Sequence, residues 1–129
     1  MNYNLTITLK STYLHAIVTG VNTKEGVVRY LEEIRRECVT RNCFRVLIEE
    51  RLEGPRIGTM DVFELSDRGS SKAPGMFEAI AYVDVNAVSD SMHFAETVAR
   101  NRGLPIFVFS TVAEAEKWLL ETGGHEAGP

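Results

Sequence analysis

Short apolar runs with strand-like spacing alternate along this sequence with segments that carry a helical stripe, and this alternation limits the chain to a few folds. Leu5–Leu9 has an apolar residue at every second position, and Tyr13–Gly20 follows after a short polar connection, so the two predict an antiparallel hairpin. Further strands are expected at Phe44–Glu49, Phe77–Val85 and Leu104–Phe109. Strands that alternate with helices indicate a largely parallel sheet.

Capping residues and apolar stripes mark the helices between these strands. The first helix is expected to begin at Asn22, where Glu25 would complete a capping box, and the last at Thr111, where Glu114 would do the same. The first helix has an apolar stripe at helical spacing, formed by Val27, Leu31, Ile34 and Cys38. Shorter helices are expected over 60–67 and 91–101.

These elements predict an α/β fold with one five-stranded mixed sheet, in which an N-terminal antiparallel hairpin strand precedes four strand–helix units. Right-handed crossovers between neighbouring strands would place the helices mainly on one face. The domain is expected to span residues 1–122, and the glycine-rich residues 123–129 are expected to form a flexible tail.

The second face of this sheet is expected to be mixed in character. Polar residues expected there are His15, Thr19, Arg45, Glu49, Glu78 and Asp84, and the apolar residues expected beside them are Tyr13, Ile17, Leu47, Ile80 and Tyr82. An apolar patch with a charged rim is typical of an interaction surface. We therefore predict that this face forms a homodimer or is covered by the N-terminal hairpin.

Composition argues against several classes of function. The 129 residues include 14 Lys and Arg against 18 Asp and Glu, and the net charge of −4 disfavours binding to nucleic acid or to an anionic membrane. No apolar run approaches the roughly 20 residues of a membrane span, and the N-terminus is polar, so a cytoplasmic protein without membrane insertion is expected. Cys38 and Cys43 lack the spacing of a zinc site and are expected to be reduced and buried. No metal or cofactor is expected.

The apolar run that leads to Glu49 and Glu50 is followed by a loop with glycine and proline, which is where sites lie in open α/β sheets. Glu49 and Asp84 would end neighbouring strands and could share a proton or a cation, while Arg51 and Arg56 could bind an anion. The candidate ligand or partner residues are Glu49, Arg51, Arg56, Gly58, Thr59, Asp84, Asn86 and Ser89. No catalytic residue is assigned, and an enzyme would require Glu49, Asp84 and Arg56 to converge.

Four segments resemble the STAS-like group, the small bacterial proteins that look like anti-sigma-factor antagonists and carry a STAS/CRAL-TRIO label. They are Tyr13–Gly20, Phe44–Ile48, Ala79–Asp84 and Ile106–Leu119. The resemblance implies four strand–helix turns and an antiparallel edge strand. It also implies a non-enzymatic regulatory or binding module that acts through loops 49–59 and 84–91 on a protein or small molecule. The alternative is a domain of CRAL-TRIO type that binds a lipid or a small apolar ligand.

The chain departs from that group after the central strand. Anti-sigma-factor antagonists carry an Asp-Ser motif whose serine caps the next helix and is phosphorylated, whereas this chain has Gly58-Thr59-Met60-Asp61 near that position. Thr59 is the candidate phosphosite, because a phosphate at a helix N-terminus is electrostatically favourable. An ordinary N-cap is the alternative role for the same hydroxyl.

Overall fold

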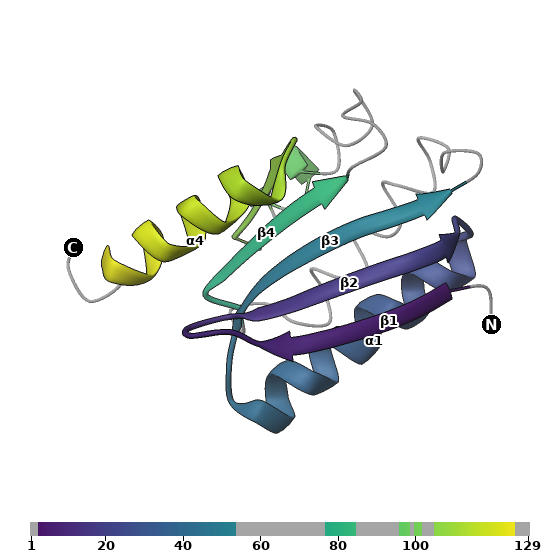
Figure 1. Cartoon of the computed structure of the whole chain (residues 1–129), viewed down its shortest axis with the longest axis horizontal. Coiled ribbons are helices and arrows are strands. Elements are labelled where there is room, and N and C mark those ends of the chain that lie inside the picture. Colours follow the sequence, from purple (N-terminus) through teal and green to yellow (C-terminus); the bar gives the residue numbers. More distant parts are fainter. Residues whose placement is uncertain (1–2, 54–76, 85–95, 99, 102–104, 126–129) are drawn as a thin grey trace.

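The computed structural model describes residues 3–53, 77–84, 96–98, 100–101 and 105–125, and it confirms the predicted fold class. A single five-stranded sheet has the order β1-β2-β3-β4-β5, with β1 antiparallel to β2 and the other pairs parallel (Figure 1). The elements are β1 (Tyr3–Leu9), β2 (Leu14–Val21), α1 (Lys24–Arg41), β3 (Arg45–Glu53), β4 (Ala79–Asp84), β5 (Ile106–Phe109) and α4 (Val112–His125).

The N-terminal hairpin lies in the plane of the sheet. β1 pairs with β2 from Tyr3 opposite Gly20 to Leu9 opposite Leu14, and the Lys10 N–H donates to the Tyr13 carbonyl at 2.8 Å. β1 is therefore an edge strand, as the family resemblance implied. The prediction that the hairpin covers the second face of the sheet is wrong, because its backbone is hydrogen-bonded sideways to β2.

Side-chain and backbone caps fix both ends of α1. The helix is capped by Thr23, whose hydroxyl accepts a hydrogen bond from the Gly26 N–H at 3.0 Å, so the predicted cap at Asn22 is one residue early. A Cβ at Gly26 would lie 2.9 Å from that hydroxyl oxygen, which explains why glycine suits this turn. Asn42 follows the last residue of the helix as its C-terminal cap; it has a left-handed φ of 52° and donates its N–H to the Val39 carbonyl.

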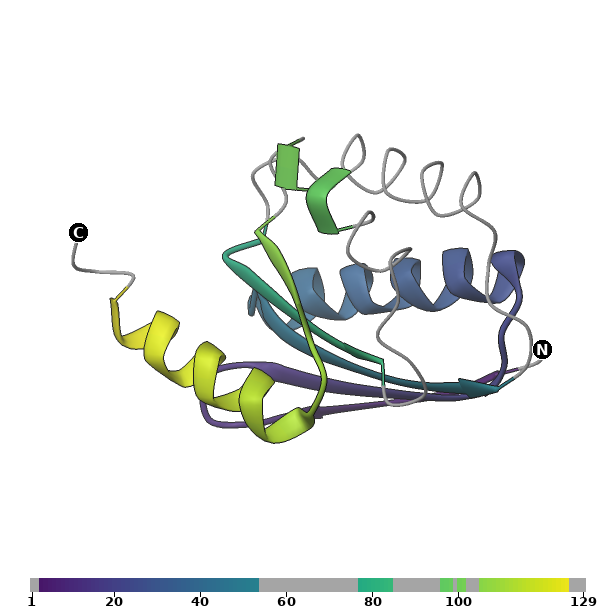
Figure 2. The same cartoon turned by 90° about the horizontal axis from the view of Figure 1, so that it is seen from above.

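The helices divide between the two faces of the sheet. α1 and the helical residues 96–98 and 100–101 lie on one face, and α4 lies on the opposite face (Figure 2). The α1 stripe of Val27, Ile34 and Cys38 is buried against β2, β3 and β4, as the helical spacing predicted. α4 differs from the one-sided expectation because its Ala115 and Leu119 form a separate core with residues of β3 and β4.

The register assigns the residues of β4 to faces differently from the sequence pattern. Ile80 and Tyr82 belong to the core under α1, whereas Ala79, Ala81 and Val83 belong to the core under α4 with Leu47. The prediction that Ile80 and Tyr82 share a face with Leu47 is therefore wrong. The two phases of this strand are both apolar, since helices cover it on both faces, and the pattern alone does not distinguish them.

Two long-range contacts hold α4 in place. Arg45 of β3 is buried and donates to the Thr12 carbonyl at 3.2 Å, to the Thr12 hydroxyl at 3.1 Å and to the Leu119 carbonyl in α4. The Tyr13 hydroxyl donates to Glu116 of α4 at 2.6 Å. The turn of the hairpin, β3 and α4 are thus tied together at one end of the sheet.

The two cysteines are free, as expected, but their surroundings differ. Both were predicted to be buried. Cys38 is buried in the α1 core, which confirms that prediction, whereas Cys43 is only half-buried. Burial raises the pKa of the Cys38 thiol to about 12, which keeps the thiol protonated at neutral pH. Among the described residues, no helix is both long and apolar enough to cross a membrane.

Candidate ligand site at the carboxyl end of β3

β3 extends further than the sequence indicated. Leu52 and Glu53 still pair with Gly20 and Val21 of β2, and the Asn22 N–H donates to the Glu53 carbonyl at 2.8 Å. The predicted end of this strand at Glu49 is therefore four residues early. Glu49, Glu50 and Arg51 lie inside a paired strand, where their side chains alternate between the two faces of the sheet.

The register decides which predicted site residues come together. Glu49 pairs with Val83, and Asp84, the last residue of β4, pairs with Glu50. The ladder therefore places Asp84 beside Glu50 rather than beside Glu49, the carboxylate with which it was predicted to form a pair. The other predicted positions lie outside the described residues: Arg56, Gly58, Thr59, Asn86 and Ser89.

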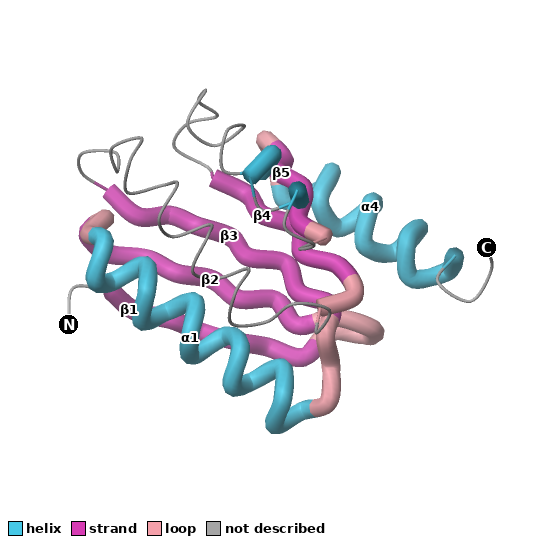
Figure 3. Tube along the Cα trace, turned by 180° about the vertical axis from the view of Figure 1, so that it is seen from behind, coloured by secondary structure: helices cyan, strands magenta, loops and turns pink. Residues whose placement is uncertain are grey.

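A buried carboxylate lies between two tyrosines under α1. Glu50 is 4 % exposed, and its Oε2 accepts a hydrogen bond from the Tyr30 hydroxyl of α1 at 3.3 Å and another from the Tyr82 hydroxyl of β4. The two hydroxyl oxygens are 3.2 Å apart. Figure 3 shows α1 lying across this face of the sheet. Three elements thus build one polar cluster, Tyr30–Glu50–Tyr82, inside an apolar core.

The second carboxylate oxygen of Glu50 differs from the first in its hydrogen bonding. Glu50 Oε1 is buried, and within the described part of the chain no group hydrogen-bonds to it. A buried acceptor without a donor costs about 1–3 kcal/mol, and more when it is charged. An unpaired buried oxygen at the carboxyl end of a parallel strand marks a place where a donor from a ligand would be stabilised.

This cluster was not predicted from the sequence. Glu50 was named only as the residue that follows Glu49 at the expected end of the strand, and no partner was assigned to it. A usable signal was present, since Tyr30 falls three residues after Val27 and four before Ile34, and so lies on the buried stripe of α1. Its contact with Tyr82 depends on tertiary packing and not on local spacing.

The buried hydroxyl of Tyr82 should make the folded state less stable at alkaline pH. Burial, reinforced by the neighbouring Tyr30 and Glu50, raises the pKa of Tyr82 well above 10.0, so the folded chain keeps the hydroxyl protonated where the unfolded chain ionises it. This contribution to stability is complete below pH 10 and declines above it by about 1.4 kcal/mol per pH unit. Urea unfolding between pH 8 and pH 11 should show a shallower decline for Tyr82→Phe than for the wild type. Equal slopes would contradict the assignment.

The other carboxylate, Glu49, is fully engaged on the α4 face. His15 Nε2 of β2 lies 2.9 Å from Glu49 Oε1, and the Arg51 guanidinium pairs with Glu49 Oε2. Both oxygens of this buried carboxylate therefore have partners, and His15, which was predicted to lie on the mixed face, is half-buried and bridges two strands. Glu49 therefore links β2 to β3, whereas Glu50 has one carboxylate oxygen without a hydrogen-bond donor among the described residues.

Among the described residues, no group of three or more His, Cys, Asp or Glu side chains is arranged to hold a metal ion.

Comparison with known proteins does not identify a family for this chain. No family model matches the chain, and no curated protein matches it. The resemblance to the STAS-like group therefore stays a prediction from the sequence motifs.

Proposed function

We propose that this chain is a non-enzymatic binding module of STAS-like type, which acts in the cytoplasm on a protein or a small molecule through residues 49–59 and 84–91. The mixed sheet with an antiparallel edge strand supports the proposal, because the family resemblance implied that arrangement. The carboxyl ends of the neighbouring parallel strands β3 and β4 also support it, since both strands end at the same edge of the sheet.

The observation that carries the proposal is the unpaired oxygen of Glu50. A carboxylate whose Oε2 accepts from two tyrosine hydroxyls, and whose Oε1 has no donor among the described residues, fits a ligand that presents an N–H group. A cationic donor is favoured over a neutral one, because a charge-assisted hydrogen bond is roughly twice as strong. The ligand group we propose is therefore a primary ammonium or a guanidinium, on a small molecule or on a side chain of a partner.

Thermal unfolding in the presence of defined probes tests this proposal. The probes are ethylamine, ethylguanidine and, as the uncharged match, ethanol. We expect the two cations to raise the Tm of the wild type and ethanol to leave it unchanged, because binding to the folded state alone stabilises it. Glu50→Gln should abolish the rise, since it removes the charge with little change of volume.

Glu78→Gln is the matched control, because Glu78 has an exposed side chain and lies outside residues 49–59 and 84–91. It should respond to the probes as the wild type does. Equal responses of the Glu50→Gln and wild-type proteins would refute the role of Glu50. Native mass spectrometry of the purified chain separates the alternative, since a retained lipid-sized apolar molecule would favour the CRAL-TRIO type of function.

A further inference from the structure

The outer edge of β1 carries backbone groups that the sheet does not use. The Lys10 N–H bonds to Tyr13, and hydrogen-bonded pairs alternate along an antiparallel ladder, so Thr8, Thr6 and Asn4 direct their N–H and C=O groups toward β2. The backbone N–H and C=O groups of Tyr3, Leu5, Ile7 and Leu9 therefore point outward from the edge of the sheet, on the side opposite β2. Among the described residues, none hydrogen-bonds to this edge.

The opposite edge of the sheet, formed by β5, is protected against pairing with another strand, whereas β1 is not. β5 has four residues and follows Pro105, and its Val108 N–H donates to the Glu96 carboxylate at 2.7 Å. β1 has seven residues, Tyr-Asn-Leu-Thr-Ile-Thr-Leu, without proline, glycine or charge. Short length, proline and covered backbone groups are the usual means of blocking an edge strand, and β1 lacks all of them.

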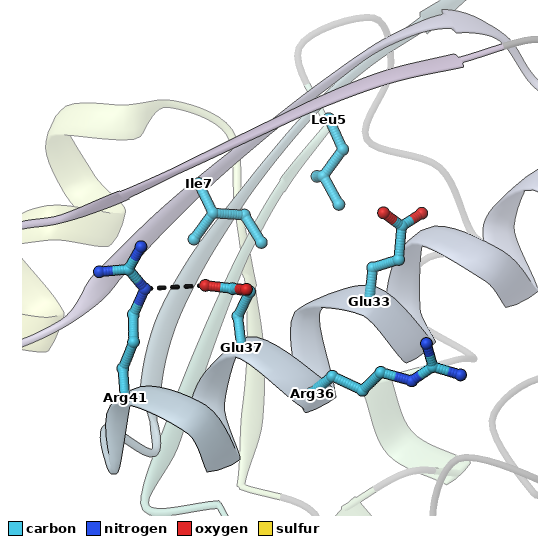
Figure 4. Close-up of a pocket in the computed structure, with 6 residues that line it drawn as sticks. All are labelled: Leu5, Ile7, Glu33, Arg36, Glu37 and Arg41. Atoms are coloured by element: carbon cyan, nitrogen blue, oxygen red, sulfur yellow. Dashed lines mark hydrogen bonds and ion pairs between the residues drawn. The ribbon is translucent and has the colours of Figure 1, made fainter.

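Charged residues of α1 line a groove of about 450 Å³ beside this edge. In Figure 4, Leu5 and Ile7 of β1 lie above the stretch of α1 that carries the charges, and Arg41 Nε donates to Glu37 at 2.8 Å. The lining charges follow the helix in the order Glu33, Arg36, Glu37 and Arg41. Their charges alternate in sign. If a second copy of this helix runs in the opposite direction, each acidic residue therefore faces a basic residue.

We propose that two copies of this chain pair antiparallel through β1, with a two-fold axis at Thr6, to form one continuous ten-stranded sheet. In this register Leu5 pairs with Ile7 of the second copy, and Tyr3 pairs with Leu9, so all outward-pointing backbone groups are used. The axis lies between Leu5 and Ile7, near the middle of the charged row. Glu33 then faces Arg41 of the second copy on both sides of the axis.

One exposed apolar side chain supports the choice of a second copy. Leu9 is 53 % exposed although it belongs to a strand. Across the proposed axis it lies opposite Tyr3 of the second copy, whose ring is half-buried against Tyr30. This surface differs from the mixed face that the sequence indicated for a homodimer, part of which α4 covers.

Amide hydrogen exchange with the wild-type chain tests the pairing residue by residue. Thr6 and Thr8 should exchange slowly in any case, because β2 protects them. In the proposed dimer the amides of Leu5 and Ile7 should exchange slowly as well, and analytical ultracentrifugation should give twice the chain mass. A monomer at submillimolar concentration, or rapid exchange at Leu5 and Ile7, would overturn the proposal.

Charge-reversal variants test the same interface independently of exchange. Arg41→Glu should weaken the dimer about tenfold, since at each of two symmetric positions it replaces a guanidinium opposite Glu33 of the other copy with a carboxylate. The double variant Glu33→Arg/Arg41→Glu should recover most of that loss. Ile17→Lys, on the mixed face, is the matched control and should leave the dimer intact. A dimer that Ile17→Lys dissociates and Arg41→Glu does not would place the interface on the mixed face and refute the β1 pairing.

Discussion

Replacement of Arg45 by methionine is expected to lower the free energy of unfolding by about 3 kcal/mol. The buried guanidinium donates to the Thr12 carbonyl, the Thr12 hydroxyl and the Leu119 carbonyl, and thereby joins the hairpin turn, β3 and α4. Methionine fills much of the space but supplies no donor, so it removes three hydrogen bonds, one of which goes to the carbonyl of the fully buried Leu119. Chemical denaturation monitored by circular dichroism measures the loss.

Two further variants calibrate that result. Arg45→Lys keeps the charge but not the planar fork of donors, so it should lose a substantial part of the same stability. Lys117→Met is the surface control, since Lys117 of α4 is exposed, and it should change stability by less than about 0.5 kcal/mol. If Arg45→Met and Lys117→Met have similar effects, the three contacts of Arg45 do not contribute to stability.

Truncation of Leu119 to alanine is also expected to cost about 3 kcal/mol. Leu119 is fully buried between α4 and the sheet, in the core that includes Leu47, Ala81 and Val83. Its removal leaves a cavity in the smaller of the two cores, where few other apolar side chains are available to fill it. Urea unfolding should show the loss as a lower midpoint with an unchanged slope.

The neighbouring residue offers a matched control for this truncation. Leu120 is the next residue of α4 and is 48 % exposed, so Leu120→Ala removes the same atoms from the same helix with little loss of burial. Its effect should remain below about 0.5 kcal/mol. Similar losses for Leu119→Ala and Leu120→Ala would mean that α4 does not pack on the sheet as described.

The sequence predicted those features of the fold that depend on local spacing. The α1 stripe, the hairpin and the cap of α4 are local, and the structure confirms each of them; Glu114 N–H donates to the Thr111 hydroxyl at 3.2 Å. The position of α4 on the second face was not predictable in the same way. It depends on whether its stripe packs against Ala81 and Val83 or against Ile80 and Tyr82, and both sets are apolar.

The candidate site shows the same limit. The side chains of Glu49 and Glu50, which are adjacent in β3, point to opposite faces of the sheet. Their different hydrogen bonding was not predictable: Glu49 is paired with His15 and Arg51, whereas no group in the described part of the chain hydrogen-bonds to Glu50 Oε1. That difference arises from neighbours on other strands and on α1. Spacing along the chain carries no information about it.

The strand order has a consequence for how the chain forms during synthesis. Each strand pairs with the strand that precedes it, so the sheet can grow in the direction in which the ribosome delivers it. The residues that α1, β2 and β3 contribute to the core under α1 are all present once β3 has been synthesised. Ala115 and Leu119 of the other core come from α4, so Leu47 lacks these two partners until α4 has been synthesised. We therefore expect α4 to be the last of the described elements to pack.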